Sequence, residues 1–411
     1  MKRLQLTPHL TMCMTGFSYV ASSSVIAPIL SIYVKDVINA PVEMVGVVTA
    51  MFFIASALAR LSLGVFAGGR KTITFLLFAF VILSICPALY PLTDSIAVLI
   101  VLRVAQGFAY AFIGTASLIL AALAISSLER DKGVGTYTAS LSLGLLAGPA
   151  ITTVSIPVFG ISNTFYFATL MGLVGIFAAF FLYMKISTIE RNWQIIGVSV
   201  KRESLKSKIS AITRNQMFSV AFIGNFVFYI LFGVLLAYAP LYAKNTLNFS
   251  TELVSVLFLL YYTATTVTRL SIGRIVRKVS KSTLVILGTV LAALFSFTLA
   301  IVTDNFIFAG IFALIGAIHG VLFPAGSMLI AEYVQPSRNV FANSLYLMVI
   351  DVGQGIAPLI TAGVIVQYGL ESSFIVSAAI SATAALLLIW LNLHKSPLSD
   401  PNSNKKSLRV Q

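Results

Sequence analysis

Residues 59–64 read Ala-Arg-Leu-Ser-Leu-Gly, and residues 268–273 read Thr-Arg-Leu-Ser-Ile-Gly. The similarity extends well beyond these two segments. At the same constant offset the pairs are Tyr33 with Tyr242, Lys35 with Lys244, Asn39 with Asn248, Glu43 with Glu252 and Arg60 with Arg269. Thr93-Asp94 matches Thr303-Asp304 when the offset is one residue longer. Self-similarity sustained over most of a half-chain indicates internal duplication. The sequence therefore predicts two copies of one unit, with the function between them.

The composition indicates that each copy is a membrane unit. Of the 411 residues 58% are hydrophobic and 10% are charged, which leaves too little polar surface to cover a water-soluble globule. Apolar runs of about 20 residues, each able to cross the hydrocarbon core, recur along the chain. Their length favours helices over strands. The predicted helices are residues 10–33, 43–66, 72–92, 96–125, 134–158, 162–184, 217–243, 251–275, 281–302, 305–333, 338–368 and 371–394.

We therefore predict an all-α membrane protein of twelve transmembrane helices, arranged as two pseudo-symmetric six-helix bundles. The first bundle comprises residues 1–184 and the second residues 217–394. A basic cytoplasmic linker at 185–216 joins them, and residues 395–411 form a disordered cytoplasmic tail.

The net charge of +14 would suggest nucleic acid in a soluble protein, but its distribution is a membrane signal. When the loops are numbered alternately, one side holds nearly all the Lys and Arg residues and the other holds only Lys35 and Lys244. This is the positive-inside pattern, so we predict a plasma-membrane protein with both termini in the cytoplasm. The basic face suits contact with anionic lipid, and we expect no nucleic-acid partner.

The sequence gives little support to an enzyme or a nucleotide-driven pump. It contains no phosphate-binding Gly-x-x-x-x-Gly-Lys-Ser/Thr loop and only three histidines, and it has no cluster of metal ligands, so we expect neither metal nor cofactor. Cys13 and Cys86 both fall inside predicted helices, where we expect buried small hydrophobic groups. A channel is also disfavoured, because no ring of charge or filter-like loop repeats.

Four motifs, in order, make nearly the whole chain resemble the major facilitator superfamily. Residues 64–71 (Gly-Val-Phe-Ala-Gly-Gly-Arg-Lys) are similar to its loop after helix 2, and residues 103–107 (Arg-Val-Ala-Gln-Gly) to its Arg-x-x-Gln-Gly motif. Residues 144–149 (Gly-Leu-Leu-Ala-Gly-Pro) resemble the Gly-x-x-x-Gly-Pro motif of the proton-antiporter branch. Residues 342–355 are similar to a segment of drug and sugar efflux permeases.

We predict gating or structural roles for the motif residues, which are Arg60, Gly64, Arg70, Lys71, Gly144, Gly148, Pro149, Arg269 and Gly273. Arg60 and Arg269 lie at the predicted cytoplasmic ends of helices 2 and 8, where they could snorkel or bond the helix ends of the facing half. Pro149 is a predicted kink point. The chain departs from the family in one respect. Its first loop lacks the acidic residue that helps to latch the cytoplasmic face, and the second copy has a base there. Any latch in this protein must therefore use other groups.

Ionisable residues at membrane depth are costly and default to functional hypotheses. Arg103 lies in predicted helix 4, near Gln106. It could interact with a carboxylate or clamp an anionic substrate through its planar guanidinium. The alternative is a structural arginine bonded to backbone carbonyls. Asp351 lies near mid-depth in predicted helix 11, where it could carry the coupling proton or bond neighbouring helices.

His319 occupies the second-copy position that corresponds to Gln106, with Gly320 matching Gly107. It could relay protons or bind substrate, and the alternative is a satisfied histidine between helices. Asn225 and Tyr229 lie one turn apart on predicted helix 7 and could offer polar contacts among aromatic walls, or simply pack.

These features favour a secondary active transporter that works by alternating access, with predicted helices 1, 4, 7 and 10 around a mid-membrane cavity. The first hypothesis is proton-coupled efflux of small organic or amphipathic compounds, with small-molecule substrate and protons as partners and the protein as a monomer. The alternative is proton-linked uptake of an organic anion, with Arg103 as the clamp.

Overall fold

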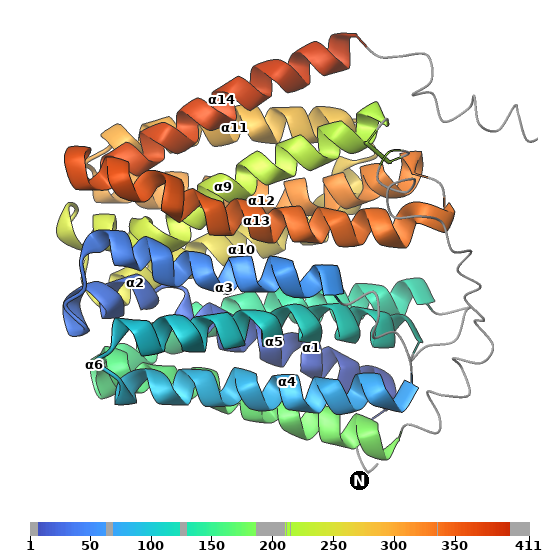
Figure 1. The fold of residues 1–411 in the computed structure, drawn as a ribbon. Helices are drawn as coiled ribbons and strands as arrows, with labels where there is room; N and C mark the ends of the chain where they lie inside the picture. Colours follow the sequence, from blue (N-terminus) through green and yellow to red (C-terminus); the bar gives the residue numbers. More distant parts are fainter. Residues whose placement is uncertain are drawn as a thin grey trace, which may run out of the picture. The chain divides into compact units, whose positions relative to one another are not determined.

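The computed structural model describes residues 7–62, 69–123, 130–185, 210, 212–213, 215–334 and 336–394. Within these ranges the regular secondary structure is helical, and no strand is present (Figure 1). Gly64, the side chain of Arg70, nearly all of the predicted linker and the predicted tail lie outside the described residues.

The helices follow the predicted ones closely. In the first half of the chain they are α1 (Pro8–Ile26), α2 (Leu30–Ile32), the π-helix η1 (Tyr33–Val37), α3 (Val42–Ser62), α4 (Gly69–Leu89), the 3₁₀ turn η3 (Tyr90–Leu92), α5 (Ile96–Leu123) and α6 (Arg130–Met184). In the second half they are α9 (Gln216–Asn245), α10 (Thr251–Ile275), α11 (Lys281–Ile301), α12 (Asn305–Tyr333), α13 (Pro336–Tyr368) and α14 (Glu371–Leu393).

Eleven helical stretches of the described chain are long and apolar enough to cross a membrane. One of them, Gly135–Met184, is 50 residues long, whereas a single crossing needs about 20. This stretch lies in α6, which is interrupted at Gly160, where φ is 76° and ψ is 170°. Gly160 thus separates two segments that match the predicted helices 134–158 and 162–184. The all-α membrane fold is confirmed.

The duplication is visible in the backbone where the first helix of each copy ends. Asn39 and its sequence partner Asn248 both adopt the left-handed conformation, with φ of 57° and 56°. Asparagine tolerates this conformation, which commonly ends a helix. The next amide then bonds back in the same way, from Ala40 to the Val34 carbonyl at 3.1 Å and from Phe249 to the Ala243 carbonyl at 2.9 Å. The two copies therefore share a turn as well as a sequence.

The chain divides into two compact units. The first contains Met1–Val198 together with Leu235–Tyr262, and the second contains Ser199–Val234 together with Thr263–Gln411. The adjoining ends of α9 and α10 therefore belong with the first unit, although the sequence repeat assigns them to the second copy. The domain boundaries at 184 and 217 stay a prediction.

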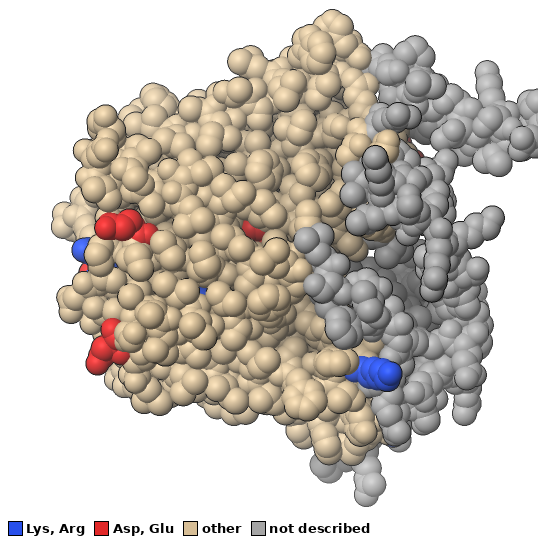
Figure 2. Space-filling model, in the orientation of Figure 1, with Lys and Arg blue, Asp and Glu red and all other residues tan. Residues whose placement is uncertain are grey.

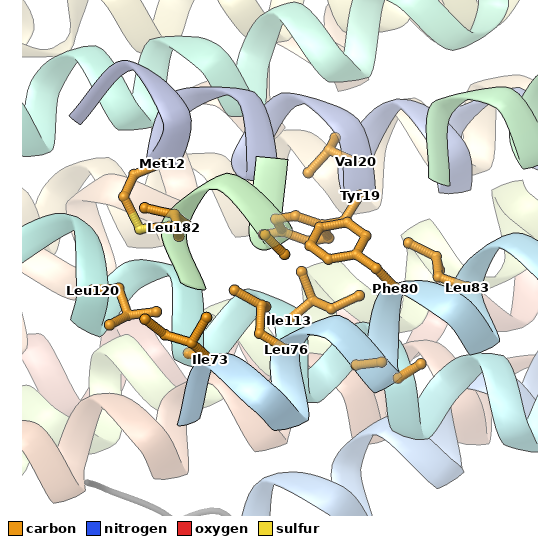
Figure 3. Close-up of a cluster of buried hydrophobic side chains, with 14 of the residues drawn as sticks. Met12, Tyr19, Val20, Ile73, Leu76, Phe80, Leu83, Ile113, Leu120 and Leu182 are labelled. Carbon is orange, nitrogen blue, oxygen red and sulfur yellow. The ribbon is translucent and has the colours of Figure 1, made fainter. Parts of the chain in front are cut away.

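Glycines determine how helices of the first unit pack. Helix α1 packs most extensively on α6. A side chain at Gly144 or Gly148 of α6 would collide with the α1 backbone near Phe17 or Ser24. The Ser24 hydroxyl donates to the Gly144 carbonyl at 2.7 Å. A buried apolar cluster from α1, α4, α5 and α6 lies beside this contact and includes Met12, Tyr19, Leu76, Phe80, Ile113 and Leu182 (Figure 3).

In the second unit α11 packs against both α12 and α14. The Ser296 hydroxyl of α11 donates to the Phe374 carbonyl of α14 at 2.8 Å. Large apolar side chains point outward along these helices, as a surface in contact with lipid requires. On the face drawn in Figure 2, the charged side chains of the described residues are few and separated by wide uncharged areas.

Candidate functional site

Among the described residues, three side chains of the types Arg, Lys, Asp, Glu and His are buried, and all three are predicted site residues. The exposed fractions are 5% for Arg103, 3% for Asp351 and 6% for His319. Arg103 lies in the first unit, and Asp351 and His319 lie in the second.

Arg103 on α5 is held from several sides. Its Nη1 donates to Oε1 of Gln106, one turn along the same helix, at 2.7 Å. Its Nε donates to the Val48 carbonyl of α3 at 3.4 Å, and its guanidinium carbon lies 4.3 Å from the centre of the Phe52 ring. These contacts fix the guanidinium plane. The bond to the Val48 carbonyl is the kind expected of a structural arginine.

Gly107 explains why α3 comes close enough to contact Arg103. A side chain at this position would overlap the carbonyl oxygen of Phe52. Only glycine permits this approach of α5 to α3, which brings Val48 and Phe52 beside the guanidinium. In the Arg-x-x-Gln-Gly motif, the glycine thus sets the helix spacing and the polar residues occupy the space beside it.

Two tyrosines that the sequence did not single out as site residues complete this group. The Tyr90 hydroxyl donates to Oε1 of Gln106 at 2.6 Å, and the Tyr33 hydroxyl donates to the Tyr90 carbonyl at 2.6 Å. Tyr33 was visible in the sequence as a member of the repeat. Nothing in the sequence signalled Tyr90, since its partner lies 16 residues away on the next helix.

Gln106 keeps one unused donor in this group. Its Oε1 accepts from both Arg103 and Tyr90, whereas its buried Nε2 has no hydrogen-bond partner. Among the described residues, no Asp or Glu lies within ion-pair distance of Arg103. The group is therefore a fixed positive charge next to a free N–H donor, which suits an anionic or carbonyl-bearing partner.

His319 lies in an aromatic environment in the second unit. Its Nε2 is 3.0 Å from the Tyr229 hydroxyl of α9. The rings of Phe228, Tyr229 and Phe232 are centred 5.5, 5.4 and 4.9 Å from the imidazole. The structure thus joins two of the predicted site residues, His319 and Tyr229, across α9 and α12.

The predicted correspondence of Gln106-Gly107 with His319-Gly320 stays a prediction, but the two glycines pack in a similar way. A side chain at Gly320 would overlap the Thr265 carbonyl of α10, just as one at Gly107 would overlap the Phe52 carbonyl of α3. In each copy the glycine of the fourth helix packs against the backbone of the second helix. The residue before it is buried and polar in both cases, Gln106 in the first copy and His319 in the second. The two residues lie about one helical turn apart in the repeat, because the register of Asp94 with Asp304 pairs Gln106 with Gly316.

Asp351 lies on α13, a helix that packs closely on α9. A side chain at Gly353 would approach the Phe226 carbonyl to 2.8 Å and the Tyr229 Cβ to 3.3 Å. A side chain at Gly233 would approach the Gln354 carbonyl oxygen to 2.5 Å. The buried carboxylate therefore lies on a helix that contacts the segment of α9 carrying Tyr229.

Asn225 occupies the next turn of α9. Its Nδ2 donates to the Ala221 carbonyl at 3.0 Å, and its buried Oδ1 has no hydrogen-bond partner. Gly326 of α12 lets this amide lie close to Tyr346 of α13, and the Tyr346 hydroxyl donates to the Phe323 carbonyl at 2.9 Å. Helix α9 thus presents two polar residues, Asn225 and Tyr229, toward α12 and α13.

Comparison with protein families shows which family this chain belongs to. The model of the Major Facilitator Superfamily matches residues 12–303 and 221–410. The chain belongs to the Major Facilitator Superfamily.

Relatives within the superfamily include two transporters that span most of this chain. A proton-coupled antiporter flippase, LtaA, of Staphylococcus haemolyticus is 25% identical over 361 residues, covering 86% of each chain. The multidrug resistance protein MdtG of Dickeya zeae is 22% identical over 385 residues, covering 91% of each chain. Among solved structures, a bacterial homolog of the human lysosomal transporter Spinster superposes with a TM-score of 0.73 at 12% identity, covering 95% of this chain and 98% of that one.

The repeat arginines Arg60 and Arg269 both interact with the fourth helix of their own copy. Arg60 on α3 donates to the Thr115 hydroxyl of α5 at 3.4 Å, and Arg269 on α10 lies 5.7 Å from the Phe323 ring of α12. These contacts suit the predicted gating or structural role. Lys71 is exposed, and Gly273 faces open space.

Proposed function

We propose that this superfamily member is a proton-coupled exporter of small organic or amphipathic compounds that works by alternating access. The observation that carries the proposal is the burial of Asp351 at 3% exposure, the one buried carboxylate among the described residues. An ionised carboxylate at membrane depth costs several kcal/mol, roughly 3 on insertion scales. A group of this kind is suited to gain and lose one proton during each transport cycle.

His319 and Tyr229 supply the neighbouring polar surface in this proposal. They meet at 3.0 Å beside the rings of Phe228 and Phe232, so a hydroxyl and an imidazole lie together within apolar walls. Small amphipathic compounds match such a surface, because their apolar part packs on rings and their polar part finds a hydrogen-bond partner. The relatives LtaA, a proton-coupled antiporter flippase, and MdtG, a multidrug resistance protein, support the same class of activity.

The proposal is tested by pH-gradient-driven transport in proteoliposomes, against a panel of lipophilic cations, organic acids and sugars. We expect Asp351→Asn to abolish proton-driven transport of the substrate that the panel identifies, because the amide cannot take up and release the proton. Substrate binding or exchange without a gradient should remain measurable.

The matched control is Asp94→Asn, which makes the same change at an exposed carboxylate and should leave transport intact. Full gradient-driven transport by Asp351→Asn would remove Asp351 from the coupling role. Flux that is unsaturable and independent of the gradient would point instead to a channel.

A second candidate function is proton-linked uptake of an organic anion. It is favoured by Arg103, which is buried with no described acid at ion-pair distance, and by the free Nε2 of Gln106 beside it. A carboxylate that reached this place could accept from both groups. In this case the guanidinium is the clamp for the substrate.

Counterflow of labelled carboxylates into vesicles tests the second candidate. We expect Arg103→Ala to abolish counterflow and Arg103→Lys to weaken it at least tenfold, because lysine keeps the charge but loses the planar pair of donors. Arg274→Ala, which removes an exposed arginine, is the control. Carboxylate counterflow that survives in Arg103→Ala would exclude Arg103 as the anion clamp.

A further inference from the structure

The two sequence copies are joined by an ion pair at one end of the first unit. The Lys244 ammonium lies 2.5 Å from a carboxylate oxygen of Asp36. The two side chains are 33% exposed for Asp36 and 31% exposed for Lys244. Both residues belong to the same compact unit, because that unit includes Leu235–Tyr262.

Both partners lie in the same short segment of the repeat, at adjacent positions, since Lys244 corresponds to Lys35 and Asn245 to Asp36. Asp36 lies in the π-helix Tyr33–Val37, and Lys244 lies in the last turn of α9. Each segment ends at a left-handed asparagine, Asn39 or Asn248. Because the same backbone turn ends both segments, the positions of the two charged residues along the chain are set by the duplication.

The pair is nevertheless single, because the copies differ at one residue. Asp36 follows Lys35 in the first copy, whereas Asn245 follows Lys244 in the second. The symmetric counterpart of the ion pair would join Lys35 to residue 245, which carries no charge. Lys35 instead lies 3.5 Å from the Ala40 carbonyl of its own segment. Asp36 and Lys244 thus provide one specific charged link between the copies.

The π-helix that carries Asp36 is also linked to the buried Arg103 group. Tyr33, its first residue, donates to the Tyr90 carbonyl, and Tyr90 donates to Gln106, which holds Arg103. Short π-helical turns inside or at the end of α-helices often mark functional positions. Movement of this turn would therefore shift Tyr90 and, through its hydrogen bond, the side chain of Gln106.

We propose that the Asp36–Lys244 pair is a latch that holds the predicted outer ends of the two copies together in one state of the transport cycle. The proposal rests on the alternating access proposed above. When the latch is broken, the ends of the π-helix and of α9 separate more often. The connection through Tyr33, Tyr90 and Gln106 places the latch under the influence of the Arg103 group.

Hydrogen–deuterium exchange of the full-length protein in lipid nanodiscs tests the latch without any substrate. The reporters are the amides of residues 33–40 and 242–249, which include the bonded amides of Ala40 and Phe249. We expect Asp36→Asn and Lys244→Gln each to raise exchange in both segments by up to about fivefold, the range that an exposed ion pair supplies. The double variant should exceed neither single one, and the charge exchange D36K/K244D should restore protection.

Lys35→Gln is the matched control, because it removes the same charge at the equivalent position of the first copy. It should leave exchange at 242–249 unchanged. An effect of each substitution on its own segment alone, additive effects in the double variant, or an equal effect of Lys35→Gln would overturn the latch. A failed transport assay would refute the proposed function and leave these exchange results standing.

Discussion

At the scale of single residues, the family motifs of this protein act first through their glycines. Gly107, Gly148 and Gly320 each lie where an added Cβ would collide with the backbone of a neighbouring helix. Without water between them, membrane helices associate through close van der Waals contact, and small residues permit it. The polar residues beside these glycines are consequently held in fixed places.

This packing predicts the effect of one methyl group. Gly148→Ala should destabilise the protein by about 1–3 kcal/mol, the usual cost of overpacking, since the added carbon would collide with Ser24 of α1. Thermal unfolding in detergent measures the change. Gly310→Ala adds the same methyl group where nothing lies within 4 Å and should leave the melting temperature unchanged or slightly raised. Equal stability of the two variants would contradict the packing account.

At the scale of elements, irregular turns determine where spans end and where side chains lie, as regular helices do. The π-helix Tyr33–Val37 ends the first span and positions both Tyr33 and Asp36. Gly160 interrupts α6 with φ of 76° and ψ of 170°, a conformation that is open almost exclusively to glycine. It turns one continuous apolar stretch into two spans without a loop of ordinary length.

The turn at Gly160 can be tested separately from packing, because nothing lies within 4 Å of its Cβ position. Gly160→Ala should destabilise the protein by about 1–3 kcal/mol through backbone strain alone. Gly363→Ala is the control, since Gly363 also faces open space but lies inside a helix. A thermal unfolding curve of Gly160→Ala that matches the wild type would show that the turn adapts without strain.

At the scale of the whole molecule, the fourth helix of each copy carries a buried polar residue before a packing glycine, and the two polar residues differ in chemistry. Gln106 binds a fixed arginine in the first copy, whereas His319 meets a tyrosine in the second. The buried carboxylate, Asp351, lies in the second copy only. The proposed coupling residue therefore lies in the second copy, and the buried arginine lies in the first.

The predicted orientation across the membrane has a direct test. In a background with Cys13 and Cys86 replaced by alanine, a membrane-impermeant maleimide should label Ser95→Cys in intact cells. It should label Arg274→Cys only after the cells are permeabilised. Both positions are exposed, so accessibility of the side chain itself does not differ. The opposite pattern would reverse the positive-inside assignment.

The sequence by itself determined the membrane fold, the places of the helices and the three buried ionisable residues. Apolar run length decides where spans lie, and the cost of charge in hydrocarbon makes Arg103, Asp351 and His319 conspicuous.

Only the tertiary structure decided which side chains meet. Tyr90 with Gln106, Tyr229 with His319 and Asp36 with Lys244 join residues on different helices. Such contacts depend on the spacing and rotation of packed helices, which the periodicity within one helix does not specify. The physical reason is that hydropathy acts along the chain, whereas hydrogen bonds and ion pairs require side chains to come within about 3–4 Å in space.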